Sequence, residues 1–195
     1  MNTRAEALSI IIKVTEHGAY LSDTLRMHFR EQKREGADGK AWQRDKAFVT
    51  RLCTDVAKRL MELDFRINLY AKTKVKKMHP VVRNILRMSA CQLYYMDGVP
   101  ASAAVNEAVK LAKANGQMKA AGFINGILRS MAREEKPYPY ENDVPLKMEA
   151  LSVAFSMPEW LVKKFVERFG VEKTKEILAC YQTPAPLSVR TNVSR

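Results

Sequence analysis

Cysteine is scarce in this sequence, and its spacing is not that of a disulfide framework. The chain has 195 residues and three cysteines, Cys53, Cys91 and Cys180. An odd number of widely separated thiols indicates reduced cysteines. Glycine and proline are also few, at eight each, which excludes collagen-like and low-complexity classes. The sequence therefore predicts a globular fold stabilised by an ordinary hydrophobic core.

Long apolar runs and a secretion signal are also missing. The longest uncharged apolar stretch is far shorter than the roughly 20 residues that a membrane-spanning helix needs. Residues 1–12 carry Arg4 and Glu6 where a signal peptide would have its apolar core. We therefore predict a cytoplasmic protein with no membrane association.

The common catalytic and cofactor motifs are absent as well. The chain has no GxGxxG, no GxxxxGK followed by Ser or Thr, no HExxH and no CxxC. Its three histidines, His17, His28 and His79, fall on separate expected elements with no Cys or carboxylate at ligand spacing. Cys53 falls on the apolar stripe of its expected helix, as a core residue does. We predict no catalytic residue, no cofactor site and no metal site in this chain.

Positive charge is what the sequence has in excess. Lys and Arg number 33 against 21 Asp and Glu, a net charge of +12. Residues 1–136 carry a net +11 of this and residues 137–195 only +1. A basic region of this size attracts polyanions, which makes nucleic acid a candidate partner. The alternative is a protein-interaction module whose basic surface serves solubility or an acidic partner.

Apolar residues recur at helical spacing through the first two-thirds of the chain, and no segment before Glu135 alternates like a strand. Thr3 and Glu6 have the spacing of a capping box, and Gly18 favours the end of that helix. Residues 1–135 are therefore predicted to form an all-α domain of six or seven helices. After the first helix, two more are expected at residues 20–35 and 41–62. A short helix is expected from a cap at Asp64 toward the lysines at 72–77, and a longer one from His79-Pro80 to the turn at Asp97-Gly98. The last two are expected at residues 101–114 and 117–133.

A proline-rich stretch separates this domain from the rest. Residues 136–145 contain three prolines and two tyrosines, the composition of a semi-extended linker. Beyond the linker, Ser156 and Glu159 repeat the capping spacing ahead of a helix, and residues 171–181 predict another. Residues 146–195 are therefore expected to begin a second domain.

The last nine residues differ from everything before them. Residues 187–195 alternate apolar and polar side chains, which is the period of a β-strand. A lone strand needs a neighbour for its backbone hydrogen bonds. We therefore expect the chain to be a fragment of a longer protein.

Two segments carry a resemblance to a known fold. Residues 99–113 (VPASAAVNEAVKLAK) resemble the signature segment of the NusB family of all-α RNA-binding proteins, and residues 122–129 (GFINGILR) are similar to its next helix. In that helix, Gly122 and Gly126 are expected to let another helix approach closely. A stand-alone antitermination factor of this family is one function that the resemblance implies.

A wider resemblance covers nearly the whole chain. Residues 151–162 (LSVAFSMPEWLV) and 189–192 (VRTN) resemble the RsmB family of bacterial 16S ribosomal RNA (cytosine-5) methyltransferases. The resemblance implies an N-terminal NusB-like domain, a small connecting domain and a C-terminal methyltransferase domain that uses S-adenosylmethionine. The family's nucleophilic cysteine follows Pro or Thr, and none of the three cysteines here does. The resemblance thus implies an RNA-binding, non-catalytic region whose partners are 16S ribosomal RNA and its own catalytic domain beyond Arg195.

RNA binding would depend on basic side chains that neutralise phosphates. We select basic residues near helix starts or on polar helix faces, close to the segments that carry the resemblance. Arg83 and Arg87 are the pair that we expect on one helix face. The candidate RNA-binding residues are Arg4, Lys46, Arg83, Arg87, Lys119 and Arg129.

Overall fold

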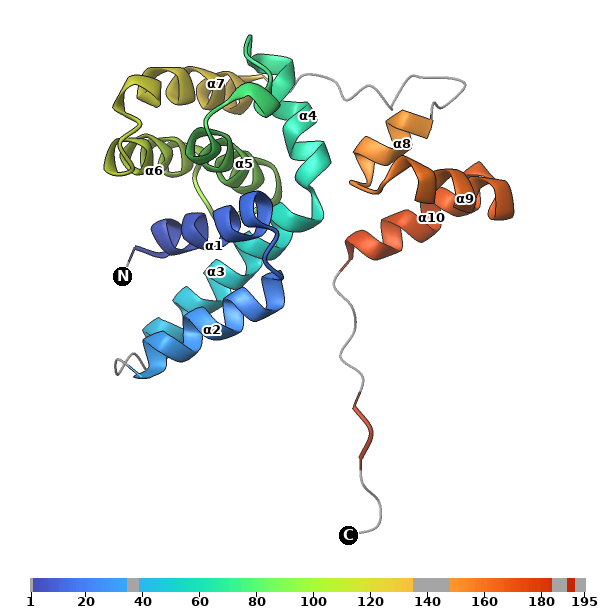
Figure 1. Ribbon diagram of the computed structural model, residues 1–195, viewed down its shortest axis with the longest axis horizontal. Coiled ribbons are helices and arrows are strands. Elements are labelled where there is room, and N and C mark those ends of the chain that lie inside the picture. The colour runs from blue at the N-terminus through green and yellow to red at the C-terminus, as the bar shows by residue number, and fades with distance from the viewer. Residues whose placement is uncertain (1, 35–38, 135–147, 184–188, 192–195) are drawn as a thin grey trace.

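The computed structural model describes residues 2–34, 39–134, 148–183 and 189–191, and these residues are helical almost throughout (Figure 1). They form ten α-helices and two short 3₁₀ helices, with no strand among them. The all-α class predicted from the sequence is confirmed. No described helix is both long enough and apolar enough to cross a lipid bilayer.

The first helix, α1 (Thr3–His17), begins and ends where the sequence predicts, but a different residue caps it. The carboxamide oxygen of Asn2 accepts a hydrogen bond from the Ala5 amide at 3.2 Å. Thr3, which we expected to be the cap, is already helical. Gly18 ends the helix in the left-handed conformation, with φ of 70°, a geometry that glycine adopts without strain.

The next expected helices differ more from the structure. α2 (Leu21–Arg34) is as predicted, but the single helix expected over 41–62 is two, α3 (Lys40–Lys58) and α4 (Leu60–Tyr70). The break lies at Arg59, whose guanidinium stacks 3.9 Å from the centre of the Tyr95 ring. Asp64, the expected cap of a short helix, lies inside α4.

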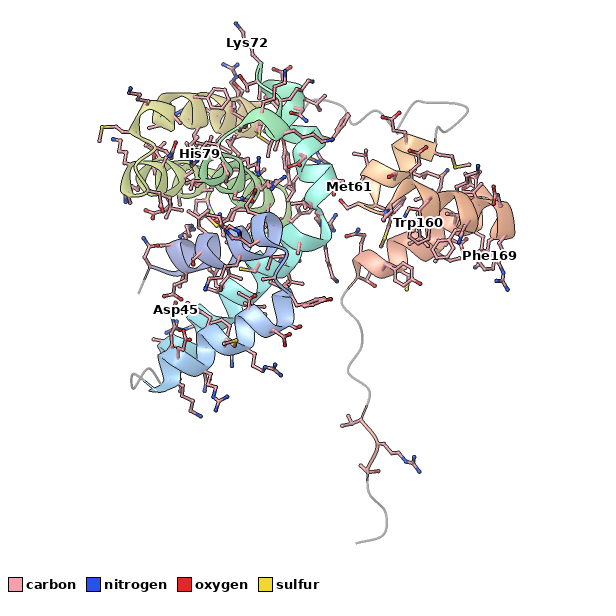
Figure 2. All side chains as sticks on the ribbon, viewed as in Figure 1. Asp45, Met61, Lys72, His79, Trp160 and Phe169 are labelled. Carbon is pink, nitrogen blue, oxygen red and sulfur yellow. The ribbon has the colours of Figure 1, made fainter. Side chains whose placement is uncertain are left out.

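The helix α5 (Pro80–Tyr95) runs through the middle of the first domain and contacts α1, α3, α4, α6 and α7. Its start is as predicted, because Pro80 occupies the first turn and the His79 ring accepts from the Val81 amide at 3.3 Å. Before it, the lysine-rich segment forms only a 3₁₀ turn, η1 (Val75–Lys77), anchored by the buried Val75. Lys72 projects into solvent from this end of the domain (Figure 2).

Two antiparallel helices cover one side of α5. α6 (Ala101–Ala114) matches its predicted bounds, and η2 (Met118–Ala120) leads into α7 (Ala121–Arg133). We expected Gly122 and Gly126 to allow a close helix contact. Both lie on the exposed side of α7, and no described atom outside the glycine's chain neighbours and the backbone of α7 itself comes within 4 Å of a Cβ placed at either position. That expectation is wrong for the described residues.

A second, smaller group of helices follows, made of α8 (Met148–Ala154), α9 (Glu159–Phe169) and α10 (Val171–Gln182). Its buried core contains only Leu151, Val162 and Leu178, whereas the first domain has one continuous core from α1 to α7. Residues 189–191 form no strand. The other positions of the predicted strand, and the predicted linker at 136–145, lie outside the described residues.

Ser156 connects the two groups of helices. We expected it to cap α9, but its hydroxyl accepts a hydrogen bond from the Glu62 amide at 3.1 Å. Glu62 is the third residue of α4, and Arg59 at the start of α4 provides no side-chain acceptor. Ser156 therefore supplies, from 94 residues away, the cap that α4 lacks. Its φ of 49° is unusual for a residue with a side chain.

Candidate nucleic-acid interface

The Arg83–Arg87 pair lies on one face of α5, as its spacing predicts, but this face points into the protein. Arg83 donates through Nε to Glu16 of α1 at 2.8 Å, and a second guanidinium nitrogen also contacts that carboxylate. Arg87 is 8% exposed and binds Asp64 of α4 through two nitrogens, at 2.6 and 2.7 Å. Both positive charges are therefore matched inside the domain.

The electrostatics of this network agree with a structural role. The hydrogen bond from Arg83 is the largest influence on Glu16, and together with Asn84 and Arg87 it lowers the pKa of that carboxyl to about 2, against the opposing effect of burial. A charge held this firmly is not available to an external phosphate. We therefore leave Arg83 and Arg87 out of the surface proposed below.

A second buried cluster surrounds Glu62, which is 4% exposed. Its carboxylate accepts hydrogen bonds from Arg66 at 3.0 Å, from Arg59 at 3.1 Å and from the Tyr95 hydroxyl. Burial and the nearby Glu62 charge raise the pKa of Tyr95. This cluster connects the start of α4 to α5, and its arginines are already paired with Glu62.

Arg4 lies at the start of α1 and is positioned by two neighbours. Its Nε donates to the Gln92 side chain at 2.8 Å, and its guanidinium lies 5.3 Å from the centre of the Phe48 ring. No carboxylate of the described residues pairs with it. Its charge is therefore fixed in place by α5 and α3 and is not neutralised there.

Lys46 lies on the exposed side of α3, in the midst of aromatic side chains. Its ammonium is 5.1 Å from the centre of the Trp42 ring and 5.3 Å from that of Phe29. Such cation–π contacts hold a lysine near aromatic surface without cancelling its charge. Trp42 was not among the residues that the sequence singled out.

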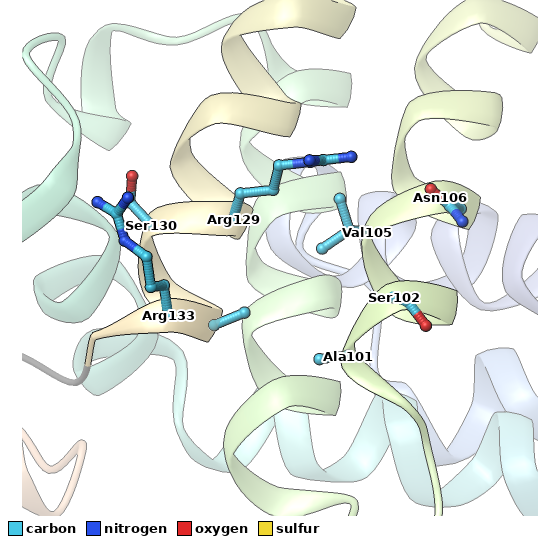
Figure 3. Close-up of a pocket in the computed structure, with 8 residues that line it drawn as sticks. Ala101, Ser102, Val105, Asn106, Arg129, Ser130 and Arg133 are labelled. Atoms are coloured by element: carbon cyan, nitrogen blue, oxygen red, sulfur yellow. The ribbon is translucent and has the colours of Figure 1, made fainter.

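The last two candidates belong to the other end of the domain. Lys119 is exposed on η2, and Arg129 is exposed on α7, where it donates to Asn125 at 3.1 Å. Arg129 extends toward α6 over a hollow of about 550 Å³ between the two helices (Figure 3). No carboxylate lines this hollow. Its lining residues are Ala101, Ser102, Val105, Asn106, Arg129, Ser130, Ala132 and Arg133.

A second hollow of about 500 Å³ continues between the same helices. Lys110 and Lys113 line it together with Asn106, Asn125 and other uncharged residues. We name the two hollows together the α6–α7 groove. The structure thus separates the six candidates. Arg129 lines this groove and Lys119 lies on η2, the turn that leads from α6 into α7. Arg4 and Lys46 lie at α3, and Arg83 and Arg87 are paired with carboxylates of the same domain.

Comparison with known proteins first defines the class. The fold is similar to that of T. maritima NusB, with a TM-score of 0.58 at 23% identity over 69% of this chain and 91% of that one. It is also similar to the crystal structure of PH0851, with a TM-score of 0.68 at 14% identity over 95% of this chain and 40% of that one. The likeness to T. maritima NusB defines a NusB-like helical fold.

The sequence comparisons assign the family. Residues 1–133 match the model of the NusB family, and the chain belongs to that family. Residues 157–195 match the ferredoxin-like domain of RsmF/B-like methyltransferases.

Curated relatives extend the similarity across the chain. A probable ribosomal RNA small subunit methyltransferase B of Bacillus subtilis is 29% identical over 191 residues, which is 98% of this chain and 40% of that protein. The corresponding Synechocystis protein is 34% identical over 148 residues, 76% of this chain and 33% of that protein. The chain therefore spans about two fifths or less of the length of these relatives.

Proposed function

We propose that this chain is the RNA-binding N-terminal region of an S-adenosylmethionine-dependent 16S ribosomal RNA (cytosine-5) methyltransferase. One observation carries the proposal: a NusB family match at residues 1–133 is followed in the same chain by a match to the ferredoxin-like domain of RsmF/B-like methyltransferases. Relatives named as methyltransferases of ribosomal RNA match 98% of the chain. In this proposal the chain holds RNA while a separate catalytic domain, its intramolecular partner, transfers the methyl group in the cytoplasm.

The charge distribution supports RNA as the ligand. The α6–α7 groove is lined by lysine, arginine, uncharged polar side chains and small apolar residues, with no carboxylate among its lining residues. Such surfaces neutralise phosphates and release counterions on binding. We assign phosphate contacts to Lys119 and Arg129 near this groove, and to Arg4 and Lys46 beside α3.

The described residues do not fit S-adenosylmethionine. A nucleoside cofactor needs an enclosed, mostly apolar pocket with a carboxylate for the ribose hydroxyls. The hollows between α6 and α7 and the hollow between α2 and α3 are open and lined by basic side chains, with no carboxylate among their lining residues. A further hollow on the other side of α3 is lined by Asp55, but this carboxylate lies 3.5 Å from Arg51. We propose that the methyl donor binds to the catalytic domain and not to this part of the protein.

Charge reversal at Arg129, which lines the α6–α7 groove, and at Lys119, on the turn that leads into α7, tests the proposal. The variant Lys119→Glu/Arg129→Glu is compared with Lys163→Glu/Lys164→Glu, which changes two exposed lysines of α9 by the same total charge. Affinity for protein-free 16S ribosomal RNA is measured by filter binding at low salt. We expect the groove variant to lose at least about tenfold in affinity and the α9 variant to lose much less.

Two results would contradict the proposal. If the parent chain binds 16S ribosomal RNA no better than an acidic polypeptide of equal charge, the basic surface serves a protein partner. Equal losses in the two variants would show that net charge, and not this groove, determines the affinity.

A further inference from the structure

A ridge of three residues divides the exposed side of α3. Trp42, Lys46 and Thr50 follow one another at four-residue spacing and therefore share one face of the helix. A hollow of about 640 Å³ lies on the α2 side of this ridge, and one of about 680 Å³ lies on the other side. All three ridge residues line both hollows. We call the ridge and its two hollows the α2–α3 surface.

The hollow on the α2 side is strongly basic. Arg26, Arg30, Lys33 and Lys46 line it, and no carboxylate does. Arg26 pairs with Asp23 at 2.9 Å, but both side chains are mostly exposed, so the pair is weak. Arg30 and Lys33 form no ion pair within the described parts of the chain. This hollow therefore presents unneutralised positive charge next to an aromatic ring.

The Trp42 ring is held in a fixed orientation. Its indole N–H points at the Gln32 side-chain oxygen, 3.4 Å away, and its plane meets the Phe29 ring edge-on at 6.4 Å and 85°. The ring is half-buried, packs against the core at one edge and lines both hollows. A fixed aromatic side chain surrounded by cations is the arrangement on which unpaired bases stack in single-stranded nucleic acid complexes.

The second hollow extends this surface toward the smaller group of helices. Arg51, Lys58 and the single carboxylate of its lining, Asp55, line it from α3, and Gln182 lines it from α10. Arg51 is partly engaged, since it lies 3.5 Å from Asp55 and donates to the Tyr95 carbonyl at 3.0 Å. Basic side chains thus flank Trp42 on both sides, and a strand lying across the ridge would reach phosphate partners before and after the stacked base.

We infer that the α2–α3 surface binds a single-stranded segment of RNA, with one base stacked on Trp42 and the adjacent phosphates on Arg30, Lys33 and Lys46. A duplex does not fit this description, because its bases are already stacked on one another and do not offer a free face. The inference rests on the proposed function, since it specifies which form of RNA the chain binds and where.

The two tryptophans of the chain allow a direct test. Trp160, on α9, also has a lysine over its ring, with Lys164 at 5.4 Å, but it is 61% exposed and lines none of the hollows described above. The variant Trp160→Phe leaves Trp42 as the only tryptophan, and Trp42→Phe leaves Trp160. Each is titrated with a single-stranded RNA hexanucleotide and with the same sequence as a duplex, while tryptophan fluorescence is recorded.

We expect the single strand to quench the fluorescence of the Trp160→Phe protein, where only Trp42 emits, and to leave that of Trp42→Phe nearly unchanged. The duplex should quench neither. Replacing Trp42 by Leu should weaken single-strand binding by about 5- to 150-fold, the effect of losing one stacked base. If that variant does not fold, the variant Arg30→Gln/Lys33→Gln replaces it, because it removes two exposed charges of the α2–α3 surface. It should weaken single-strand binding more than the control variant Lys163→Gln/Lys164→Gln, which removes two exposed charges of α9.

The outcomes separate this inference from the proposed function. Salt-dependent binding of 16S ribosomal RNA without quenching of Trp42 would overturn the inference and leave the proposed function standing. Absence of binding to any RNA would overturn both. The inference would also be overturned if polyglutamate quenched the Trp42 fluorescence as strongly as the hexanucleotide does, because the surface would then recognise an acidic protein.

Discussion

Removing the Glu16 carboxylate should destabilise the protein at neutral pH and much less in acid. In the folded state Arg83 holds the pKa of Glu16 at about 2, against an ordinary value of 4.5. A difference of about 2.5 pKa units corresponds to at most about 3.4 kcal/mol, and partial solvent screening reduces this to about 2 kcal/mol. The depressed pKa stabilises the folded state above pH 4.5, and this contribution is lost as the pH falls from 4.5 toward 2.

The test is urea unfolding of the parent chain and of Glu16→Gln at pH 7, 4 and 3. We expect the variant to be less stable by about 2 kcal/mol at pH 7, with a difference that shrinks at each lower pH. Glu31→Gln is the control, because Glu31 is exposed and forms no ion pair with a described residue. A difference that is absent at pH 7, or that stays constant down to pH 3, would refute the role given to this network.

Three further predictions follow from particular contacts. Arg87→Gln leaves the Asp64 carboxylate, which is 23% exposed, without its cationic partner and should cost about 2–3 kcal/mol in the free energy of unfolding, measured by urea denaturation; a loss below about 1 kcal/mol would contradict a stabilising pair. Ser156→Ala removes the cap of α4 and should cost about 1 kcal/mol in the same assay, whereas an unchanged midpoint would show that the hydrogen bond contributes nothing. Burial raises the pKa of the Cys53 and Cys91 thiols to about 12. Iodoacetamide at pH 8 should therefore label only Cys180 in the native protein, as judged by mass spectrometry. Rapid labelling of two or three thiols would disprove the burial of Cys53 and Cys91.

Helix boundaries set by local chemistry were predictable from the sequence. Gly18 ends α1 because glycine adopts the left-handed conformation there, and Pro80 begins α5 because a proline needs no amide partner in the first turn. The bounds of α6 were also predicted, from the apolar periodicity between two turns. In each case the determining residues are neighbours in the sequence.

Features that depend on distant residues were not predictable in this way. The break at Arg59 interrupts a stretch whose apolar periodicity is continuous, and at the break Arg59 stacks on Tyr95, 36 positions later in the chain. Ser156 has the spacing of a cap for its own helix, yet it caps α4. A sequence pattern identifies a capping residue but not which amide in the folded chain it reaches.

The candidate interface also combines features that the sequence predicts with features that depend on distant residues. Spacing correctly put Arg83 and Arg87 on one helix face, but that spacing is identical for a solvent-exposed face and for one buried against carboxylates. Their partners Glu16 and Asp64 are far away in sequence, at separations of 67 and 23 residues from the arginines they bind. Trp42 escaped notice because a single aromatic residue in an amphipathic helix is most often a core residue.

Salt dependence of RNA binding tests the central claim most directly. The dissociation constant of this chain for protein-free 16S ribosomal RNA is measured at 50 and 200 mM KCl. If about four phosphates of an unpaired strand are neutralised, binding should weaken by about 50-fold between these concentrations. Absence of binding at 50 mM KCl, or an affinity that does not change with salt, would contradict an RNA-binding role for this chain.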